Sequence, residues 1–170
     1  MLQRFRQAFS WRPIAIIFAV ISGGFGGWRY HTMSTPTQAF SCKVIAITDG
    51  DTFSCLSENQ KKTIRLYGID APEKKQAYGQ AARQYLSRQI FGKTVSVTSF
   101  GEDAYGRILG RVRMGDHEVN HKMVVAGYAW VYRQYSDDAG LIGAEETARA
   151  AKAGLWADPQ PINPADFRHR

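Results

Sequence analysis

The chain has 170 residues, 44% of them hydrophobic, which allows one globular domain with a sizeable core and little more. Its formal charge of +7 is concentrated at the start, because residues 1–41 carry four arginines and no acidic residue. Residues 42–170 hold 18 basic and 15 acidic side chains, so charge alone is weak support for a polyanionic partner.

Residues 1–41 are predicted to be an N-terminal signal segment with a linker. The basic opening MLQRFRQAFSWR precedes the apolar run PIAIIFAVISGGFGGW, residues 13–28. This run is too short to span a bilayer comfortably, because about 20 apolar residues are needed, and it has the build of a secretory signal. Thr37–Ala39 is only a loose cleavage site, so an uncleaved membrane anchor through residues 13–28 is the alternative. In both cases we expect an extracytoplasmic protein, periplasmic or secreted.

Two cysteines flank the first predicted hairpin. Cys42 and Cys55 bracket KVIAITDGDTFS, in which Asp49–Gly50 is a dipeptide that favours a tight turn. With that turn, Cys55 faces Val44, and Cys42 lies diagonal to it on the same face of the hairpin. In an oxidising compartment we expect a disulfide between Cys42 and Cys55, with two buried thiols as the alternative.

The hydrophobic pattern predicts a sheet with inserted and following helices. Alternation predicts five main strands, over residues 42–48, 52–56, 63–67, 93–100 and 107–114, and a short strand at 118–119. Helical spacing predicts helices over residues 78–90, 120 to about 130, and 136 to 154. The Pro-rich residues 158–170 are expected to be irregular. This order favours an α+β fold, a small closed barrel with helical additions.

The stretch RLYGIDAPEKK, residues 65–75, gathers an arginine and two acids around a glycine and a proline. Alternation turns Arg65 away from the apolar side of its strand, so its guanidinium is available for a ligand. Asp51, Asp70 and Glu73 stand at strand ends that can converge at one mouth of a barrel. Such hard oxygen ligands suit calcium or magnesium, and a loop carbonyl can complete the shell.

Each of these residues alone also has a structural explanation. Asp51 is more often a hairpin-end residue, Asp70 a loop carboxylate before a proline, and Glu73 an acid in the first turn of a helix. Arg107 alternates with two further arginines along a strand face, and such a face is usually solvated. The spacing therefore predicts a candidate site and leaves the reaction open.

An ordered set of motifs resembles a known family. TDGDTF, IRLYGIDAPE and DAYGRILG, followed by VNHKMVVAGYAWVY and GLW, closely resemble the staphylococcal nuclease (thermonuclease) family over residues 42 to about 156. The resemblance implies a five-stranded OB-type barrel with three helices over residues 42–157. It implies a monomeric, calcium-dependent, sugar-nonspecific endonuclease that cuts single- and double-stranded DNA and RNA to 3′-phosphate and 5′-hydroxyl ends.

The resemblance also implies a role for each member of the candidate site. According to this resemblance, the calcium ligands are Asp51, Asp70 and the backbone carbonyl of Ala71. By it, the catalytic residues are Arg65, Glu73 and Arg107. Phosphodiester hydrolysis builds charge on the phosphoryl oxygens, so a divalent cation and two guanidinium groups fit the chemistry. Glu73 would take the proton of the attacking water or orient that water, and the sequence leaves both open.

Two tyrosines match family positions that contact nucleic acid. Tyr105 and Tyr135 are expected to lie against nucleotides, because aromatic contact with bases tolerates any sequence. Ala104 stands where the prototype has a lysine, and Arg133 where it has a tyrosine. These two departures put the affinity and the base preference in question.

Two other classes of function compete with a nuclease. HEVNH, His117–His121, matches a pattern in which two histidines on one helix bind zinc, but Glu118–Val119 is predicted to be a strand and only Asn120 begins the helix. A zinc protease is therefore a distant alternative. A barrel that binds nucleic acid without cutting it is a nearer one, because OB-type barrels often do so. A pure binder would not need the three acids and two arginines together.

Overall fold

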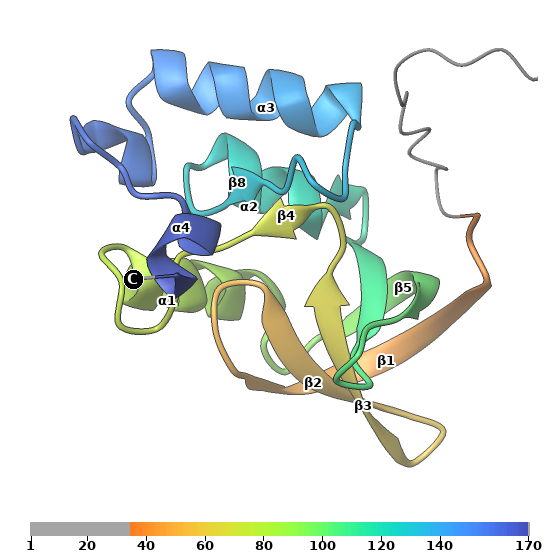
Figure 1. Cartoon of the computed structure of the whole chain (residues 1–170). Helices are drawn as coiled ribbons and strands as arrows, with labels where there is room; N and C mark the ends of the chain where they lie inside the picture. Colours follow the sequence, from red (N-terminus) through yellow and green to blue (C-terminus); the bar gives the residue numbers. More distant parts are fainter. Residues whose placement is uncertain (1–34, 170) are drawn as a thin grey trace, which may run out of the picture. The chain divides into compact units, whose positions relative to one another are not determined.

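The computed structural model describes residues 35–169, which form a barrel of strands with helices around one end (Figure 1). The long strands are β1 (Gln38–Ile47), β2 (Thr52–Ser57), β3 (Gln60–Leu66), β5 (Thr94–Glu102) and β6 (Ile108–Met114). Three short strands are β4 (Ile69–Asp70), β7 (His117–Glu118) and β8 (Trp130–Val131). The helices are α1 (Gly79–Ile90), α2 (Val119–Val125), α3 (Ala139–Ala150), the 3₁₀ turn η1 (Gly154–Ala157) and α4 (Pro164–Arg168).

The five long strands close into a barrel. Their order in the sheet is β3-β2-β1-β5-β6, with β7 added at the end of β6, and all of these neighbours are antiparallel. A parallel pairing of β3 with β6, in which Ile64 faces Ile108 and Leu66 faces Gly110, joins the two ends. A closed five-stranded barrel with helices is the α+β, OB-type architecture that the sequence predicts.

Alternate strand residues fill the barrel, and two helices cover it. The fully buried side chains of the strands include Phe53, Ile64, Val97 and Val112. Gly110 permits close approach inside this core, since a Cβ there would lie 2.9 Å from side-chain carbons of both Ile64 and Val97. Helix α2 packs against β6 and, on its other side, against α3 (Figure 1).

The first hairpin has the predicted pairing of Val44 with Cys55 but a longer connection between its strands. Val44 faces Cys55 as expected, but Ile47 pairs with Phe53, so the connection is longer than a two-residue turn. A bulge between Val44 and Ala46 absorbs the difference. The structure joins Cys42 to Cys55 in a disulfide whose Cα atoms are 5.6 Å apart.

The second predicted helix ends earlier than expected. Helix α2 stops at Val125 instead of reaching Trp130, because Gly127 adopts φ +71° and turns the chain. A Cβ at Gly127 would lie 2.0 Å from the carbonyl oxygen of Ala153, so only glycine fits there. Trp130 is then free to enter β8, where it pairs with Asp70 of β4. This pairing fixes the strand that carries one of the candidate site residues.

The C-terminal segment corrects the expectation of an irregular tail. Residues 164–168 form α4, a helix beyond the three expected, and the side chain of Asn163 accepts a hydrogen bond from the backbone N–H of Ala165 at 2.9 Å. Pro164 occupies the first helical position, as is common after such a cap. Gln76 Nε2 donates to the carbonyl of Ile162 at 2.7 Å and ties this segment to the loop before α1.

The predicted signal segment lies largely outside the described residues. Strand β1 begins at Gln38, so the end of the expected linker belongs to the barrel, and Ala39 pairs with Thr98. Cleavage after Ala39 would remove the first two residues of β1. Within residues 35–169, no helix is long and apolar enough to cross a membrane.

Candidate active site

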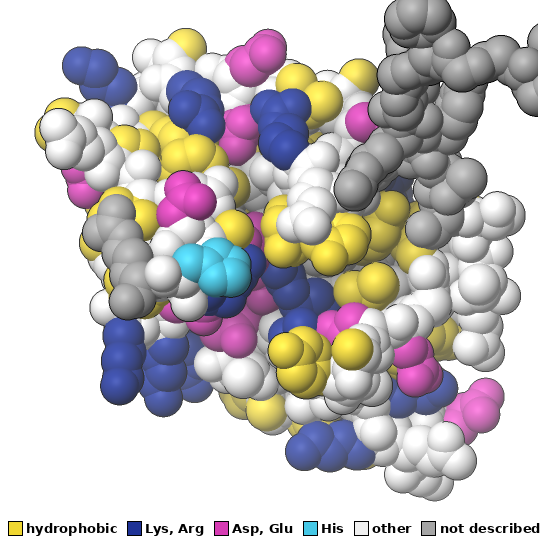
Figure 2. Space-filling model, in the orientation of Figure 1, with side chains coloured by type: hydrophobic (Ala, Val, Ile, Leu, Met, Phe, Trp, Pro, Cys, Tyr) yellow, Lys and Arg dark blue, Asp and Glu magenta, His cyan; other side chains and the backbone are white. Residues whose placement is uncertain are grey.

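One mouth of the barrel carries a cleft of about 740 Å³. Figure 2 shows a hollow on this face where acidic and basic side chains gather between apolar rims. The structure brings all eight residues of the predicted metal, catalytic and nucleic-acid sets to the lining of this cleft: Asp51, Arg65, Asp70, Ala71, Glu73, Tyr105, Arg107 and Tyr135. They come from the residue before β2, from β3, from β4 and the loop that follows it, from the loop before β6 and from the segment after β8.

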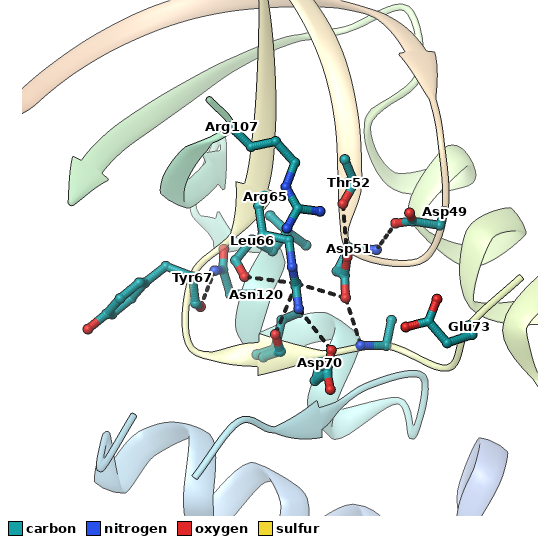
Figure 3. A network of polar contacts seen from close by, with 12 residues as sticks. Asp49, Asp51, Thr52, Arg65, Leu66, Tyr67, Asp70, Glu73, Arg107 and Asn120 are labelled. Carbon is teal, nitrogen blue, oxygen red and sulfur yellow. Dashed lines mark hydrogen bonds and ion pairs between the residues drawn. The ribbon is translucent and has the colours of Figure 1, made fainter. Parts of the chain in front are cut away.

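Arg65 bridges the two aspartates at the centre of the cleft (Figure 3). Its Nη1 lies 2.8 Å from Asp51 Oδ2, and its Nη2 lies 2.8 Å from Asp70 Oδ1. Nη1 also donates to the carbonyl of Ile69 at 3.1 Å. The exposed fractions of Arg65, Asp51 and Asp70 are 9%, 6% and 2%, so these charges are nearly removed from water. Charge-assisted hydrogen bonds in such surroundings fix the side chains firmly.

Asp51 is held by neutral donors as well. Its Oδ2 accepts from the backbone N–H of Ala71 at 2.8 Å, and its Oδ1 accepts from the hydroxyl of Thr52 at 3.0 Å. These bonds tie the start of β2 to the loop after β4, two segments that lie 20 residues apart. The carboxylate of Asp51 is therefore oriented independently of any bound cation.

Glu73 stands at the edge of the cleft and is less buried. Its side chain is 40% exposed, and its Oε1 lies 2.8 Å from Nη1 of Arg168. Its backbone N–H donates to the side chain of Gln76 at 3.0 Å, which closes a tight loop before α1. Gly79 is required in this loop, because a Cβ there would lie 1.9 Å from the carbonyl oxygen of Glu73.

Arg107 enters the cleft from the loop before β6, and its guanidinium points toward the same space as Arg65 (Figure 3). Asp103 Oδ2 lies 2.7 Å from Nη2 of Arg107, and Asp103 Oδ1 accepts from the backbone N–H groups of Tyr105 and Arg107. Partial burial acts to raise the pKa of Asp103, but the bonds from Arg107 and Tyr105 outweigh it and hold that pKa below its ordinary value. Tyr105 is 84% exposed, and its ring centre is 5.4 Å from Arg107 Cζ.

Two carboxyl groups of the cleft bind protons more tightly than usual. Burial raises the pKa of Asp70, although the bonds and charges of Arg168 and Arg65 oppose the shift. Burial and the negative charge of Asp51 raise the pKa of Asp49 to about 6. Burial is the largest cause of both shifts, because it disfavours the ionised form of a carboxyl group.

The donor set fits a hard divalent cation. Asp51 and Asp70 offer buried carboxylate oxygens, and Ala71 in the adjoining loop offers a backbone carbonyl. Among residues 35–169, no three His, Cys, Asp or Glu side chains are gathered as a ready-made metal cluster. Arg65 and Arg168 form ion pairs with Asp70, and Arg168 also pairs with Glu73.

Asp49 and Arg168 also line the cleft, although the sequence did not assign them to the site. Asp49 was assigned only to a turn, but it lines the cleft, and its Oδ1 accepts from the backbone N–H of Asp51 at 3.1 Å. Its place in TDGDTF, two residues before Asp51, was the available signal. Arg168 gave no local signal, because it reaches the cleft from a segment 98 residues after Asp70.

The histidine pattern does not form one helical face. His117 and Glu118 lie in β7, whereas His121 lies in α2. Glu118 Oε1 is 3.4 Å from Nε of Arg111, which also pairs with Asp138. The residues that a zinc protease would use are thus divided between a strand and a helix.

The fold and the cleft define an OB-type barrel protein with a charged mouth, a class that commonly binds oligonucleotides or oligosaccharides. Comparison with known proteins identifies the family within this class. A model of the family described as "Staphylococcal nuclease homologue" matches residues 63–158, and the chain belongs to the staphylococcal nuclease family.

Several relatives resemble most of the chain. An "Uncharacterized endonuclease" of Escherichia coli is 46% identical over 129 residues, 75% of this chain and 84% of that protein. An "Uncharacterized endonuclease" of Haemophilus influenzae is 43% identical over 131 residues, 76% of this chain and 74% of that protein. A "Micrococcal nuclease" of Shigella flexneri is 40% identical over 148 residues, 80% of this chain and 85% of that protein. Each of these three matches thus covers at least 75% of the chain.

Proposed function

We propose that the protein is a calcium-dependent, sugar-nonspecific endonuclease that hydrolyses DNA and RNA to 3′-phosphate and 5′-hydroxyl ends. The observation that carries the proposal is the bridging of Asp51 and Asp70 by Arg65 in a cleft that Glu73 and Arg107 also line. Membership of a family of nucleases and the names of the relatives support the same reaction class.

The chain's own residues supply the parts that phosphodiester hydrolysis needs. Arg65 approaches the cleft from β3 and Arg107 from the loop before β6, so their guanidinium groups can flank one phosphate and stabilise the charge that grows on its oxygens. Glu73, the most exposed of the three acids, is in reach of solvent and takes the proton of the attacking water or orients that water. Tyr105 and Tyr135 are 84% and 55% exposed and offer ring faces to the flanking nucleotides.

Asp51, Asp70 and the carbonyl of Ala71 would hold the calcium ion. When bound there, calcium would supply positive charge that stabilises the phosphoryl oxygens and would lower the pKa of a bound water. The buried aspartates keep this place even without an ion, because Arg65, Thr52 and the N–H of Ala71 hold them.

We further propose that the protein acts outside the cytoplasm as a monomer, either released or anchored by its N-terminal segment. The basic and apolar pattern of residues 1–28 supports export. The Cys42–Cys55 disulfide agrees with an oxidising compartment. Fractionation of cells, with the length of the mature protein measured by mass spectrometry, tests both the compartment and the cleavage.

The direct test is cleavage of a labelled single-stranded DNA by the purified protein with calcium, magnesium, zinc or EGTA. We expect cutting with calcium, none with EGTA, and 3′-phosphate ends. Cutting that needs zinc would point instead to the histidine pattern, and binding without cutting in every metal would favour the barrel that only binds.

Two substitutions assign the roles within the cleft. Glu73→Gln and Arg107→Ala should leave a folded protein that binds DNA but cleaves it slower by roughly 10²–10⁴-fold, the range that a single acid-base or charge-stabilising group supplies. Matched controls are Glu146→Gln on α3 and Arg113→Ala on β6, because both residues are exposed and outside the cleft. Cleavage at the wild-type rate by either cleft variant would remove that residue from the mechanism.

A further inference from the structure

The last helix places an arginine in the cleft. Arg168 Nη2 lies 2.9 Å from Asp70 Oδ2, and its Nη1 lies 3.2 Å from Asp70 Oδ1 and 2.8 Å from Glu73 Oε1. One guanidinium thus joins a carboxylate assigned above to calcium with the carboxylate assigned to the attacking water. Helix α4 lies beyond residue 158, where the match to the family model ends.

The position of Arg168 does not depend on its ion pairs alone. The carbonyl of Ile162 accepts a hydrogen bond from the buried side chain of Gln76, Asn163 caps α4, and Pro164 is buried. The ring of Tyr132 lies 6.0 Å from Arg168 Cζ on another side. These contacts hold the end of α4 at the cleft, which Arg168 helps to line.

A guanidinium at this point and a divalent cation need the same oxygens. Asp70 is only 2% exposed, and Arg65 and Arg168 together engage both of its oxygens. Calcium takes six to eight oxygen ligands, but the oxygens of Asp70 already accept hydrogen bonds from the two arginines. The two positive charges of calcium would also be repelled by the guanidinium groups. The side chain of Arg65 is 10% exposed and is buried with the aspartates. The side chain of Arg168 is 36% exposed, so it can move away from Asp70 into solvent.

We propose that Arg168 is an internal counter-ion of the cation site, which competes with calcium for Asp70, holds Glu73, and so sets the calcium concentration at which the site fills. The proposal rests on the calcium dependence proposed above. Calcium binding and the ion pairs of Arg168 weaken each other reciprocally. Calcium that displaces Arg168 should therefore also weaken the docking of α4 on the rest of the protein. In the absence of calcium, Arg168 keeps Glu73 engaged and the acidic pair neutralised.

The test is a calorimetric titration of calcium into the protein without nucleic acid. Arg168→Gln should lower the calcium Kd by roughly tenfold, within the range of ordinary coupling between two sites. Lys61→Gln removes the same charge from an exposed residue of β3 and should leave the Kd close to that of the wild type. Equal Kd values for wild type and Arg168→Gln would overturn the competition. Failure of both proteins to bind calcium would overturn the calcium dependence itself and the counter-ion with it.

A second experiment measures the stability of α4 instead of the affinity for calcium. Hydrogen exchange of the backbone amides of residues 165–168 should become faster when wild-type protein is saturated with calcium, Pro164 having no amide hydrogen. In Arg168→Gln the same amides should exchange faster already without calcium and change little on its addition. Protection in the wild type that saturating calcium leaves unchanged would also overturn the proposal.

Discussion

Arg65 and Asp70 are five residues apart, and the Nη2 of the arginine lies 2.8 Å from Oδ1 of the aspartate across the turn between β3 and β4. Gly68 makes this turn possible with φ +78°, a conformation that other residues rarely adopt. The same guanidinium reaches Asp51 at the start of β2. The geometry of both proposed calcium ligands therefore depends on one side chain of β3.

Replacement of Arg65 by glutamine should destabilise the protein by about 3 kcal/mol at pH 7, because it leaves buried carboxylates without their shared counter-charge. Urea denaturation in EGTA measures the loss. Addition of calcium should restore part of it, since a bound cation supplies positive charge to the same oxygens. Arg113→Gln at an exposed position is the control. A variant with wild-type stability in EGTA would show that Arg65 is not the main counter-ion of Asp51 and Asp70.

Asn120 should be among the most sensitive polar residues for stability. It is 0% exposed, its Nδ2 donates to the carbonyls of Tyr67 and Gly110, and its Oδ1 accepts from the N–H of Val112. Asn120→Ala should lower the free energy of unfolding by about 2–4 kcal/mol, because three backbone groups in or beside the core each lose a hydrogen bond. Gln84→Ala, at an exposed position of α1, should change it by less than about 0.5 kcal/mol. Similar urea midpoints for the two variants would contradict this role of Asn120.

The strands and the gathering of the acidic residues could be predicted because their signals are local. Alternation in TIRLYG fixes which side of β3 carries Arg65, and a glycine and a proline force the chain to turn beside Asp70. The pairing of Val44 with Cys55 was also right, although the turn was longer than predicted and a bulge compensated for it. The even spacing of strand residues tolerates such compensation, because only the face on which a side chain lies must be kept.

The features that the sequence did not reveal depend on contacts between distant segments. Helix α2 ends at Val125 because Gly127 packs against Ala153, and no pattern around Gly127 identifies that partner. Arg168 reaches Asp70 across 98 residues, through a five-residue helix that a Pro-rich composition conceals. A local signal for α4 was present in Asn163–Pro164, which forms a cap and a first helical residue, but nothing local indicates where this helix docks.

Asp138 should stabilise the start of α3 in a pH-dependent way. Its side chain accepts from the N–H groups of Gly140 and Leu141 and pairs with Arg111. Partial burial acts to raise the pKa of Asp138, but these bonds outweigh it and lower that pKa below the ordinary value of 3.8. Asp138→Ala should therefore cost about 1–2 kcal/mol at neutral pH, measured by urea denaturation.

The difference between the wild type and this variant should be complete above the ordinary pKa of 3.8 and disappear as the pH falls through the lower pKa of folded Asp138. Protonation of the folded carboxyl then removes the charge that the cap and Arg111 stabilise. Asp137→Ala, at the exposed neighbouring position, provides a matched control and should change stability little at either pH. A constant difference between pH 7 and pH 3 would show that the ionised form of Asp138 is not what stabilises α3.

Tyr105 should contribute to nucleic-acid binding more than to the chemical step. Its ring is 84% exposed and rests on a loop that Asp103 fixes beside Arg107. In a Glu73→Gln background, Tyr105→Ala should weaken binding of single-stranded DNA by about 1–3 kcal/mol, whereas Tyr105→Phe keeps the ring and the affinity. Phe91→Ala removes a ring that is 55% exposed but outside the cleft, and should leave binding unchanged.

In the otherwise wild-type enzyme, Tyr105→Ala should raise KM with little change in kcat, since stacking on neighbouring bases is the same before and during bond cleavage. A fall in kcat at unchanged KM would instead indicate that Tyr105 acts through Arg107 on the reacting phosphate.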